Sequence, residues 1–231
     1  MIQAHTFVTF LWAGHDWPDG KKVPTYTAQH VQVLASMLAR HGGHTLACVT
    51  DRPIPAAGVR RIAMPDAVAA LPKYYPKVWA FSDDCGKQIG QRFTYIDLDA
   101  VVVGDLGPLT ARNGDFICWN QARGEPYNTS FYTLEPGTRA TVWEKFTTAA
   151  ADHAELDWQR AGGRWTGDQS WVGHVLGSSE LMYSEGDGLK QYRPTLHRLA
   201  KEPEALAYFL CGPYDPATEA ERSAWIKASW Q

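Results

Sequence analysis

The chain has 231 residues, of which 45% are hydrophobic and 20% are charged, and its formal net charge is −3 at pH 7. This composition provides enough apolar surface for a sizeable core and excludes an intrinsically disordered chain. The slightly acidic balance argues against a broadly basic nucleic-acid-binding surface, although it leaves room for a local basic patch. No apolar run is long enough to predict a membrane span.

The cysteines and the first residues of the chain indicate the cellular compartment in which the protein is expected. Cys48, Cys85, Cys118 and Cys211 are widely spaced and form no C-x-x-C pair. The first residues also lack the basic start that is typical of a signal peptide. We therefore expect reduced thiols in a cytoplasmic protein, and no disulfide framework.

The first part of the chain alternates predicted strands with helices. Buried strands are expected at residues 6–12, 46–50 and 59–64, and a helix with apolar residues at helical spacing is expected between the first two. This alternation predicts an α/β fold with a parallel sheet and right-handed crossovers. Ligands of such sheets bind beyond the carboxyl ends of the strands, so the loops after Trp12 and Thr50 should lie at the binding edge.

The remaining elements are predicted from apolar runs and turn residues. A helix with a basic, aromatic entrance is expected at 73–81, strands at 116–119 and in the segment 125–134, an amphipathic helix around 142–146, and helices beginning at 168 and ending at 230. No linker or internal repeat interrupts the chain. The whole of residues 1–231 is therefore predicted to be one domain.

The most informative stretch is residues 93–103, an apolar run that contains Asp97 and Asp99. Burying an unpaired carboxylate is costly, and residues i and i+2 of a strand point to the same side. A hard divalent cation with a diphosphate ligand would resolve the repulsion between the two carboxylates. Alternatively, the strand stops at Ile96 and both aspartates cap a turn. Because the apolar run resumes after Asp99, we expect the carboxylates to interrupt a strand and not to end it.

Other side chains are candidates for a site, each with a structural alternative. Lys77 could reach a phosphate group or could be a solvated surface lysine. Asp168 lies in a polar cluster that opens a helix, where it could act chemically or simply cap the helix. The tryptophans near these segments suit sugar stacking and core packing equally well. They are Trp12, Trp17, Trp165 and Trp171.

Taken in order, these segments resemble the GT-A-fold glycosyltransferases, in particular the family of glycogenin and the bacterial lipopolysaccharide galactosyltransferases. The matching pieces are residues 11–14, 50–51, Lys77, 95–99, 127–130 and 167–169. The resemblance implies a single GT-A-like, Rossmann-like domain with a mostly parallel, mixed central sheet flanked by helices. It also implies a nucleotide-binding half at residues 1–110, and an acceptor-binding half with a C-terminal segment at 111–231.

The resemblance implies a nucleotide-sugar donor, usually a UDP-sugar, bound with Mn²⁺ or Mg²⁺. By the same resemblance Asp97 and Asp99 would bind the metal, Asp97 would also touch the ribose, and Lys77 would contact the donor. The residues expected to line the nucleotide pocket are Trp12, Ala13, Gly14, Thr50 and Asp51. The residues expected on the sugar and acceptor side are Asn128, Asp168 and Gln169.

Two features of the reaction stay open. The family suggests retention of configuration, with the leaving phosphate taking the acceptor proton, whereas an inverting enzyme would use a base such as Asp168. The acceptor could be a glycan, a lipid-linked sugar, a protein or a modified nucleic-acid base.

The sequence departs from the family at the third metal ligand. Where the family has a histidine, the matching segment of residues 209–213 has Cys211, and a thiolate is a poor ligand for Mg²⁺ or Mn²⁺. The lysine that follows in the family is also missing. Either water completes the metal site, or His197 serves from another loop, or metal dependence is weak.

Two other functions remain. A nucleotidyltransferase also needs carboxylates and a metal, but the loop after the first strand lacks the glycine-rich pattern that would hold a triphosphate. A catalytically decayed protein that binds a nucleotide or a sugar would account for the missing histidine. Turnover of a nucleotide sugar would separate an enzyme from such a protein.

Overall fold

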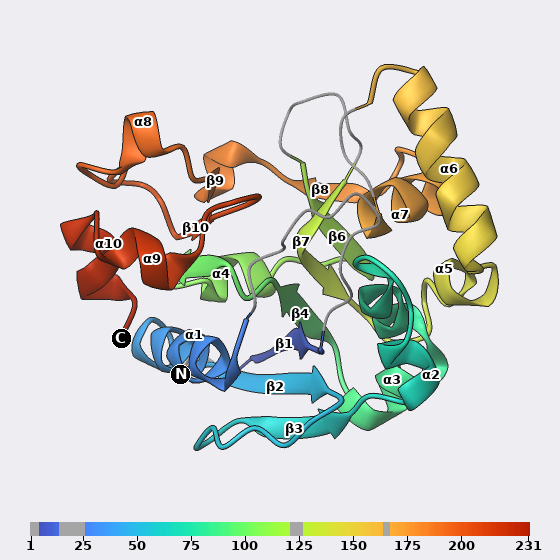
Figure 1. The fold of residues 1–231 in the computed structure, drawn as a ribbon, viewed down its shortest axis with the longest axis horizontal. Coiled ribbons are helices and arrows are strands. Elements are labelled where there is room, and N and C mark those ends of the chain that lie inside the picture. Colours follow the sequence, from blue (N-terminus) through green and yellow to red (C-terminus); the bar gives the residue numbers. More distant parts are fainter. Residues whose placement is uncertain (1–4, 14–25, 121–126, 164–166) are drawn as a thin grey trace.

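The computed structural model describes residues 5–13, 26–120, 127–163 and 167–231. Within these residues, seven strands form one sheet in the order β3-β2-β1-β4-β7-β6-β8 (Figure 1). The strands are β1 (Thr6–Leu11), β2 (Thr45–Thr50), β3 (Arg60–Ala63), β4 (Phe93–Ile96), β6 (Phe116–Trp119), β7 (Asn128–Leu134) and β8 (Leu181–Tyr183). Strand β7 runs antiparallel to β4 and β6, and the other neighbouring pairs are parallel. The predicted mostly parallel, mixed sheet is confirmed.

The first strands combine apolar side chains with threonines, and nearly all of these residues are buried. All of β1 is buried, as are the residues of β2 after Thr45. Helix α1 (Ala28–Arg40) connects them and buries Val31, Leu34, Met37 and Leu38, which recur at helical spacing. Because β1, β2 and β4 are parallel neighbours, their carboxyl ends meet at one edge of the sheet, as predicted.

The chain between Phe93 and Val103 is divided between two sheets. Strand β4 ends at Ile96, residues 97–99 turn, and β5 (Ala100–Val102) joins a three-stranded sheet in the order β5-β10-β9. The partners of β5 are β10 (Ala207–Phe209), which is antiparallel to it, and then β9 (Leu189–Gln191). The expectation that the carboxylates interrupt a continuous strand was wrong. The apolar residues after Asp99 are buried because a C-terminal strand covers them, and not because the first strand continues.

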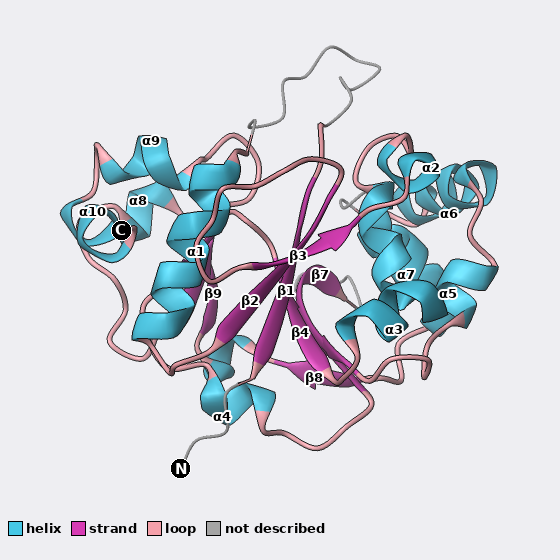
Figure 2. Ribbon diagram, turned by 90° about the horizontal axis from the view of Figure 1, so that it is seen from below, coloured by secondary structure: helices cyan, strands magenta, loops and turns pink. Residues whose placement is uncertain are grey.

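Helices cover both faces of the large sheet (Figure 2). On one side lie α1, α8 (Pro194–His197), α9 (Pro216–Ala220) and α10 (Ala224–Ser229). On the other lie α2 (Asp66–Ala69), α3 (Asp83–Ile89), α5 (Thr141–Glu144), α6 (Thr148–Arg160) and α7 (Asp168–Leu176). Two further short helices are α4 (Gly107–Thr110) and η2 (Glu185–Asp187). Each face has its own cluster of buried apolar residues.

Two predicted helices differ in form from the prediction. The helix expected at 73–81 is a 3₁₀ helix, η1 (Tyr75–Phe81), which Ser82 separates from α3 by its extended backbone. The helix expected around 142–146 is only one turn, α5, and the longer α6 begins after Thr147. The Trp143 and Phe146 rings stack on each other with their centroids 5.8 Å apart.

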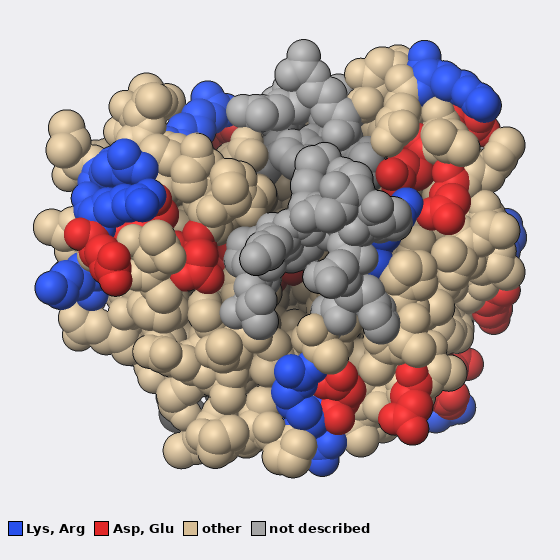
Figure 3. All heavy atoms as spheres, in the orientation of Figure 1, with Lys and Arg blue, Asp and Glu red and all other residues tan. Residues whose placement is uncertain are grey.

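No helix in the described residues is long and apolar enough to cross a membrane. Basic and acidic side chains occur in small, intermingled groups on the face shown in Figure 3, outside the grey atoms. That part of the surface therefore shows no broad basic field of the kind that binds nucleic acid.

Candidate functional site

The loops that follow β1 and β2 meet at the carboxyl edge of the sheet. The Ala13 backbone N–H donates to Asp51 Oδ2 at 3.1 Å, which joins the first loop to the second. Thr50 is buried at the end of β2, and Trp12 is half-buried with no partner for its Nε1 among the described residues. The structure thus brings Trp12, Ala13, Thr50 and Asp51 together. The predicted site residue Gly14, and also Trp17 and Trp165, lie outside the described residues.

Lys77 is a buried cation, and the alternative of a surface lysine is wrong. The residue is 6% exposed, because η1 places it under the turn that follows β4. Its Nζ lies 3.1 Å from Asp97 Oδ1 and 3.1 Å from Asp168 Oδ2. The ammonium therefore links the first aspartate of the motif to the first residue of α7.

The surroundings keep Lys77 charged. Burial alone lowers the pKa of this ammonium, but the carboxylates of Asp168 and Asp97 outweigh burial and raise its pKa above the ordinary value. The Tyr95 ring lies 5.2 Å from Nζ and stacks on Tyr132 at 4.9 Å. The Tyr95 hydroxyl also donates to Asp97 Oδ1.

Asp99 carries one of the unsatisfied polar atoms of the site. It is 7% exposed, and its Oδ1 has no hydrogen-bond partner in the part of the chain that the structure describes. Burial, followed by the charge of Asp97, raises the pKa of Asp99 from 3.8 to about 8. A buried carboxylate without a partner is costly, and a bound cation is one explanation for its presence.

The start of α7 supplies Asp168 and Gln169. Asp168 is the first residue of the helix after Gly167, and its Oδ2 accepts from Thr129 Oγ1 at 2.6 Å as well as facing Lys77. Burial raises the pKa of Asp168, although Lys77 and Thr129 oppose that rise. The N-cap of α7 is Gly167 and Asp168 lies inside the helix, so the capping alternative is wrong.

Two amides near Asp168 have an unused polar atom. Gln169 Oε1 is buried without a partner among the described residues. Asn128 accepts from Ser130 N at 2.9 Å, but its Nδ2 has no partner within the same residues. Such groups are available to hydrogen-bond a polar ligand.

Asp97 and Asp99 fit a divalent cation only in part. Their carboxylates are suitable oxygen ligands, and Asp99 Oδ1 is unused, but Lys77 and Tyr95 already contact Asp97. No three histidine, cysteine, aspartate or glutamate side chains within the described ranges are placed to hold a metal. The pair therefore suits a hard cation that completes its shell with substrate phosphate and water.

Neither candidate for a third protein ligand fits well. His197 Nδ1 accepts from Arg193 N at 3.0 Å, and its Nε2 lies 3.0 Å from Glu202 Oε1, so the proposal that it serves the metal is wrong. Burial, then the charges of Asp99 and Asp97, raise the pKa of the Cys211 thiol well above its ordinary value. Its sulfur is also a soft donor, whereas Mg²⁺ and Mn²⁺ prefer oxygen ligands.

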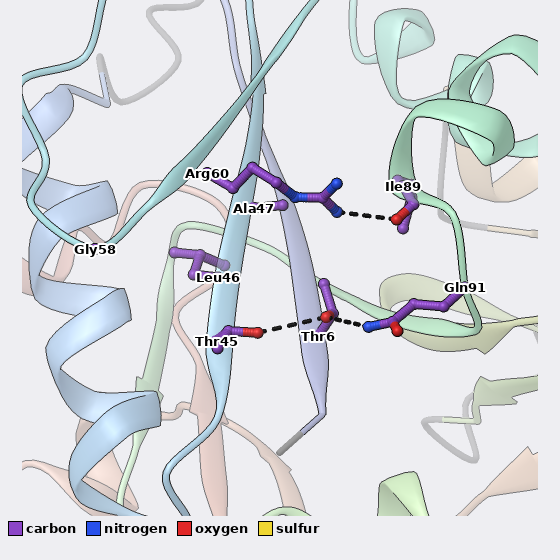
Figure 4. Close-up of a pocket in the computed structure, with 8 residues that line it drawn as sticks. All are labelled: Thr6, Thr45, Leu46, Ala47, Gly58, Arg60, Ile89 and Gln91. Atoms are coloured by element: carbon purple, nitrogen blue, oxygen red, sulfur yellow. Dashed lines mark hydrogen bonds between the residues drawn. The ribbon is translucent and has the colours of Figure 1, made fainter. Parts of the chain in front are cut away.

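A separate cavity of about 370 Å³ lies at the opposite, amino-terminal edge of the sheet (Figure 4). Its walls include Thr6, Thr45 and Arg60 from the starts of β1, β2 and β3. Figure 4 shows the Arg60 guanidinium directed at the Ile89 carbonyl and the Gln91 amide directed at the Thr6 hydroxyl. None of the candidate residues described above lines this cavity.

The fold defined by this sheet and its two helical layers is that of the GT-A glycosyltransferases. No family model and no curated protein sequence matches the chain. Among solved structures, it is similar to the galactosyltransferase LgtC in complex with donor and acceptor sugar analogs, with a TM-score of 0.56 and 15% identity. That match covers 98% of this chain and 96% of LgtC.

Two further solved structures extend the comparison. An active-site mutant of LgtC matches with a TM-score of 0.55 and 14% identity over 97% of this chain and 95% of that one. The glycosyltransferase GlyE of Streptococcus pneumoniae matches with a TM-score of 0.60 and 11% identity, over 99% of this chain and 64% of GlyE. At such low identity the likeness establishes the fold alone.

Two residues whose side chains hydrogen-bond the carboxylates of the site were not selected from the sequence. Tyr95 and Thr129 bond Asp97 and Asp168, respectively. The alternation of a strand could have indicated Tyr95, because it lies two residues before Asp97. No sequence signal pairs Thr129 with Asp168, since their contact depends on how α7 packs on β7.

Proposed function

We propose that the chain is a glycosyltransferase that moves a sugar from a nucleotide-sugar donor, most naturally a UDP-sugar, to an acceptor. The main support is the buried Lys77 between Asp97 and Asp168, together with Asp99, whose Oδ1 has no partner among the described residues. This constellation lies at the carboxyl edge of parallel strands, where such sheets bind ligands. The similar LgtC was solved with donor and acceptor sugar analogs.

The proposed roles follow the position of each residue. Residues 1–110 would form the nucleotide-binding half, with Trp12, Ala13, Gly14, Thr50 and Asp51 around the nucleotide. Residues 111–231 would form the acceptor-binding half, with Asn128 and Gln169 facing the sugar. Asp97 and Asp99 would hold Mn²⁺ or Mg²⁺. The free thiols of all four cysteines support a cytoplasmic location.

The proposed chemistry depends on charge. Departure of the nucleoside diphosphate leaves negative charge, and the Lys77 ammonium is a fixed cation that can donate to it. A bound divalent cation would supply further positive charge to the same oxygens. The sugar carbon becomes positively charged, and the Gln169 carbonyl oxygen and the Asp168 carboxylate are the nearby groups of opposite polarity.

The pairing of Asp168 favours retention of configuration. Its Oδ2 is occupied by both Lys77 and Thr129, so this oxygen is not a free general base. We therefore propose that the leaving phosphate takes the acceptor proton, while Asp168 acts electrostatically.

The proposal is tested by binding and turnover of nucleotide sugars. UDP-, GDP-, ADP-, CMP- and dTDP-sugars are each added with Mn²⁺, with Mg²⁺ and with EDTA, and the shift in Tm is measured. A donor at a hundred times its Kd should stabilise the protein by about 2.7 kcal/mol. The shift should require metal and disappear in Asp99→Asn. The matched control is Asp84→Asn, whose side chain is 81% exposed. A screen without any shift would contradict the donor site.

A non-catalytic protein that binds a nucleotide or a sugar is the second candidate. The lack of a third metal ligand among the described residues favours it. Such a protein would show the same shift in Tm but would neither transfer nor hydrolyse the sugar over long incubation.

A further inference from the structure

A second, partly buried ionic network lies beside the candidate site. Lys73 Nζ is 2.8 Å from Asp152 Oδ1 and 3.1 Å from Glu155 Oε2, both on α6. The Tyr75 hydroxyl donates to the same Asp152 oxygen at 2.9 Å. The side chains of Lys73 and Glu155 are 16% and 11% exposed, whereas that of Asp152 is 46% exposed. Glu155 is thus the enclosed carboxylate of the pair.

Glu155 also holds the start of α7. Its Oε2 accepts from the Gly167 backbone N–H at 3.0 Å, in addition to the Lys73 ammonium. Gly167 immediately precedes Asp168 and has a positive φ of 79°. One carboxylate oxygen therefore joins α6 to two segments, the one that enters η1 and the one that enters α7.

These two segments carry the side chains that meet in the candidate site. Lys77 lies on η1, four residues after Lys73, and Asp168 directly follows Gly167. The Lys77 Nζ and the Asp168 Oδ2 are 3.1 Å apart. Glu155 therefore connects the segments that enter η1 and α7, and the Lys77–Asp168 ion pair connects the same two elements within the candidate site. Among the described residues, Lys73 is the non-glycine residue with a positive φ, of 55°. A lysine adopts that conformation at a cost, which its contacts with both carboxylates offset.

We propose that Glu155 is a positioning residue, which sets Asp168 and Gln169 against Lys77 by holding the Gly167 N–H and the Lys73 ammonium. The proposal rests on the proposed transferase function, since those side chains are assigned to the sugar and the leaving group. A displacement of about 1 Å in such groups can lower a rate about a hundredfold.

The first test measures the geometry without catalysis. Amide hydrogen exchange at Gly167 is followed by NMR in the wild type, Glu155→Ala, Glu155→Gln and Asp152→Ala. Glu155→Ala should accelerate exchange at Gly167 at least tenfold, whereas Glu155→Gln should largely retain protection, because its amide oxygen can still accept the bond. Asp152→Ala is the matched control, since it removes a carboxylate from the same lysine but has no contact with Gly167. Equal exchange in both alanine variants would overturn the proposal.

The second test separates positioning from general destabilisation. With the donor found in the screen, Glu155→Ala should lower kcat by about 10- to 100-fold with little change in donor KM, because the residues assigned to the nucleotide, at the ends of β1 and β2, stay in place. Glu155→Gln should restore most of kcat, and Asp152→Ala should leave it within threefold. An equal loss of kcat in both alanine variants would overturn the proposal. A wild type without turnover would contradict the proposed function alone, and the exchange measurement would still decide the role of Glu155.

Discussion

Lys77 is the residue on which the buried charges of the site depend. Replacing it by methionine, which has a similar length, leaves Asp97 and Asp168 without their shared counter-ion. Removing one partner of a buried ion pair costs about 3–5 kcal/mol, so Lys77→Met should lower the free energy of unfolding by that amount at pH 7. Urea denaturation measures it.

The control for this prediction is Lys87→Met. The Lys87 side chain is 75% exposed and lies 3.9 Å from Asp84, so this variant should change stability by less than about 0.5 kcal/mol. A loss below about 1 kcal/mol in Lys77→Met would show that the carboxylates do not need this cation.

Asp99 makes stability depend on pH. Its pKa is raised by burial and by Asp97 to about 8, from 3.8 in an ordinary aspartate. Between these values the folded protein binds a proton that the unfolded chain has lost, so this group makes stability fall as pH rises from about 4 to about 8. Asp99→Asn should flatten that part of the curve and be more stable than the wild type at pH 8.

This prediction is checked by Tm measurements from pH 4 to pH 9 in EDTA, with Asp84→Asn as the exposed control. Mn²⁺ should reduce the difference between the wild type and Asp99→Asn if it binds this carboxylate. Parallel curves for the wild type and Asp99→Asn would contradict the raised pKa.

At the residue scale, the sequence predicted which side chains gather at the site better than it predicted their partners. Asp97 could be placed because two carboxylates in an apolar run require an explanation. The bond from Lys77 to Asp168 could not be predicted, since the two residues are far apart in sequence and only the packing of η1 against α7 brings them together. His197 was considered as a third metal ligand because the sequence pattern does not reveal that its ring nitrogens are taken up by nearby residues.

Among the elements, α3 depends on its N-terminal cap. Ser82 ends η1 with an extended backbone, and its hydroxyl accepts from Cys85 N at 3.1 Å. Ser82→Ala removes this bond in a buried position and should lower the free energy of unfolding by about 1 kcal/mol. Ser82→Thr, which can still accept the bond, is the control, and chemical denaturation compares the three proteins. Equal losses in both variants would point to packing and not to capping.

The strands show which structural features the apolar pattern of the sequence can predict and which it cannot. Strands β1 and β2 were predicted because long apolar runs bounded by turn residues have few other structures available. The run from Phe93 was predicted as one strand because periodicity does not reveal which sheet covers a residue. Strands β8, β9 and β10 have three residues each, too few for any alternation to be detected, so β8 and the small sheet of β5, β9 and β10 were not predicted.

At the scale of the whole molecule, the C-terminal helices are part of the core around α1. Ile226 of α10 is fully buried, Arg40 donates to the Ser229 carbonyl, and His30 pairs with Asp215 at 2.9 Å. Ile226→Ala should therefore destabilise the protein by about 2–5 kcal/mol. The exposed neighbour supplies the control, Lys227→Ala, which should be nearly neutral.

Far-UV and near-UV circular dichroism during urea unfolding measure this effect. Their midpoints should move together in Ile226→Ala if the C-terminal helices unfold with the sheet. A variant whose near-UV signal is lost before the helices and strands melt would contradict a shared core.

The division of residues 93–103 between two sheets affects the order in which the protein folds during synthesis on the ribosome. The turn with Asp97 and Asp99 is synthesised well before the residues that pair with it. The backbone carbonyl of Asp99 accepts from Leu210 N, and β5 pairs with β10, which both come late in the chain. Chains emerge from the N-terminus at about 5–20 residues per second, so the large sheet can assemble before β10 exists. While β10 is still inside the ribosome, the nascent chain would therefore already contain both aspartates, but the strand that follows them would lack its partner and the site would be incomplete.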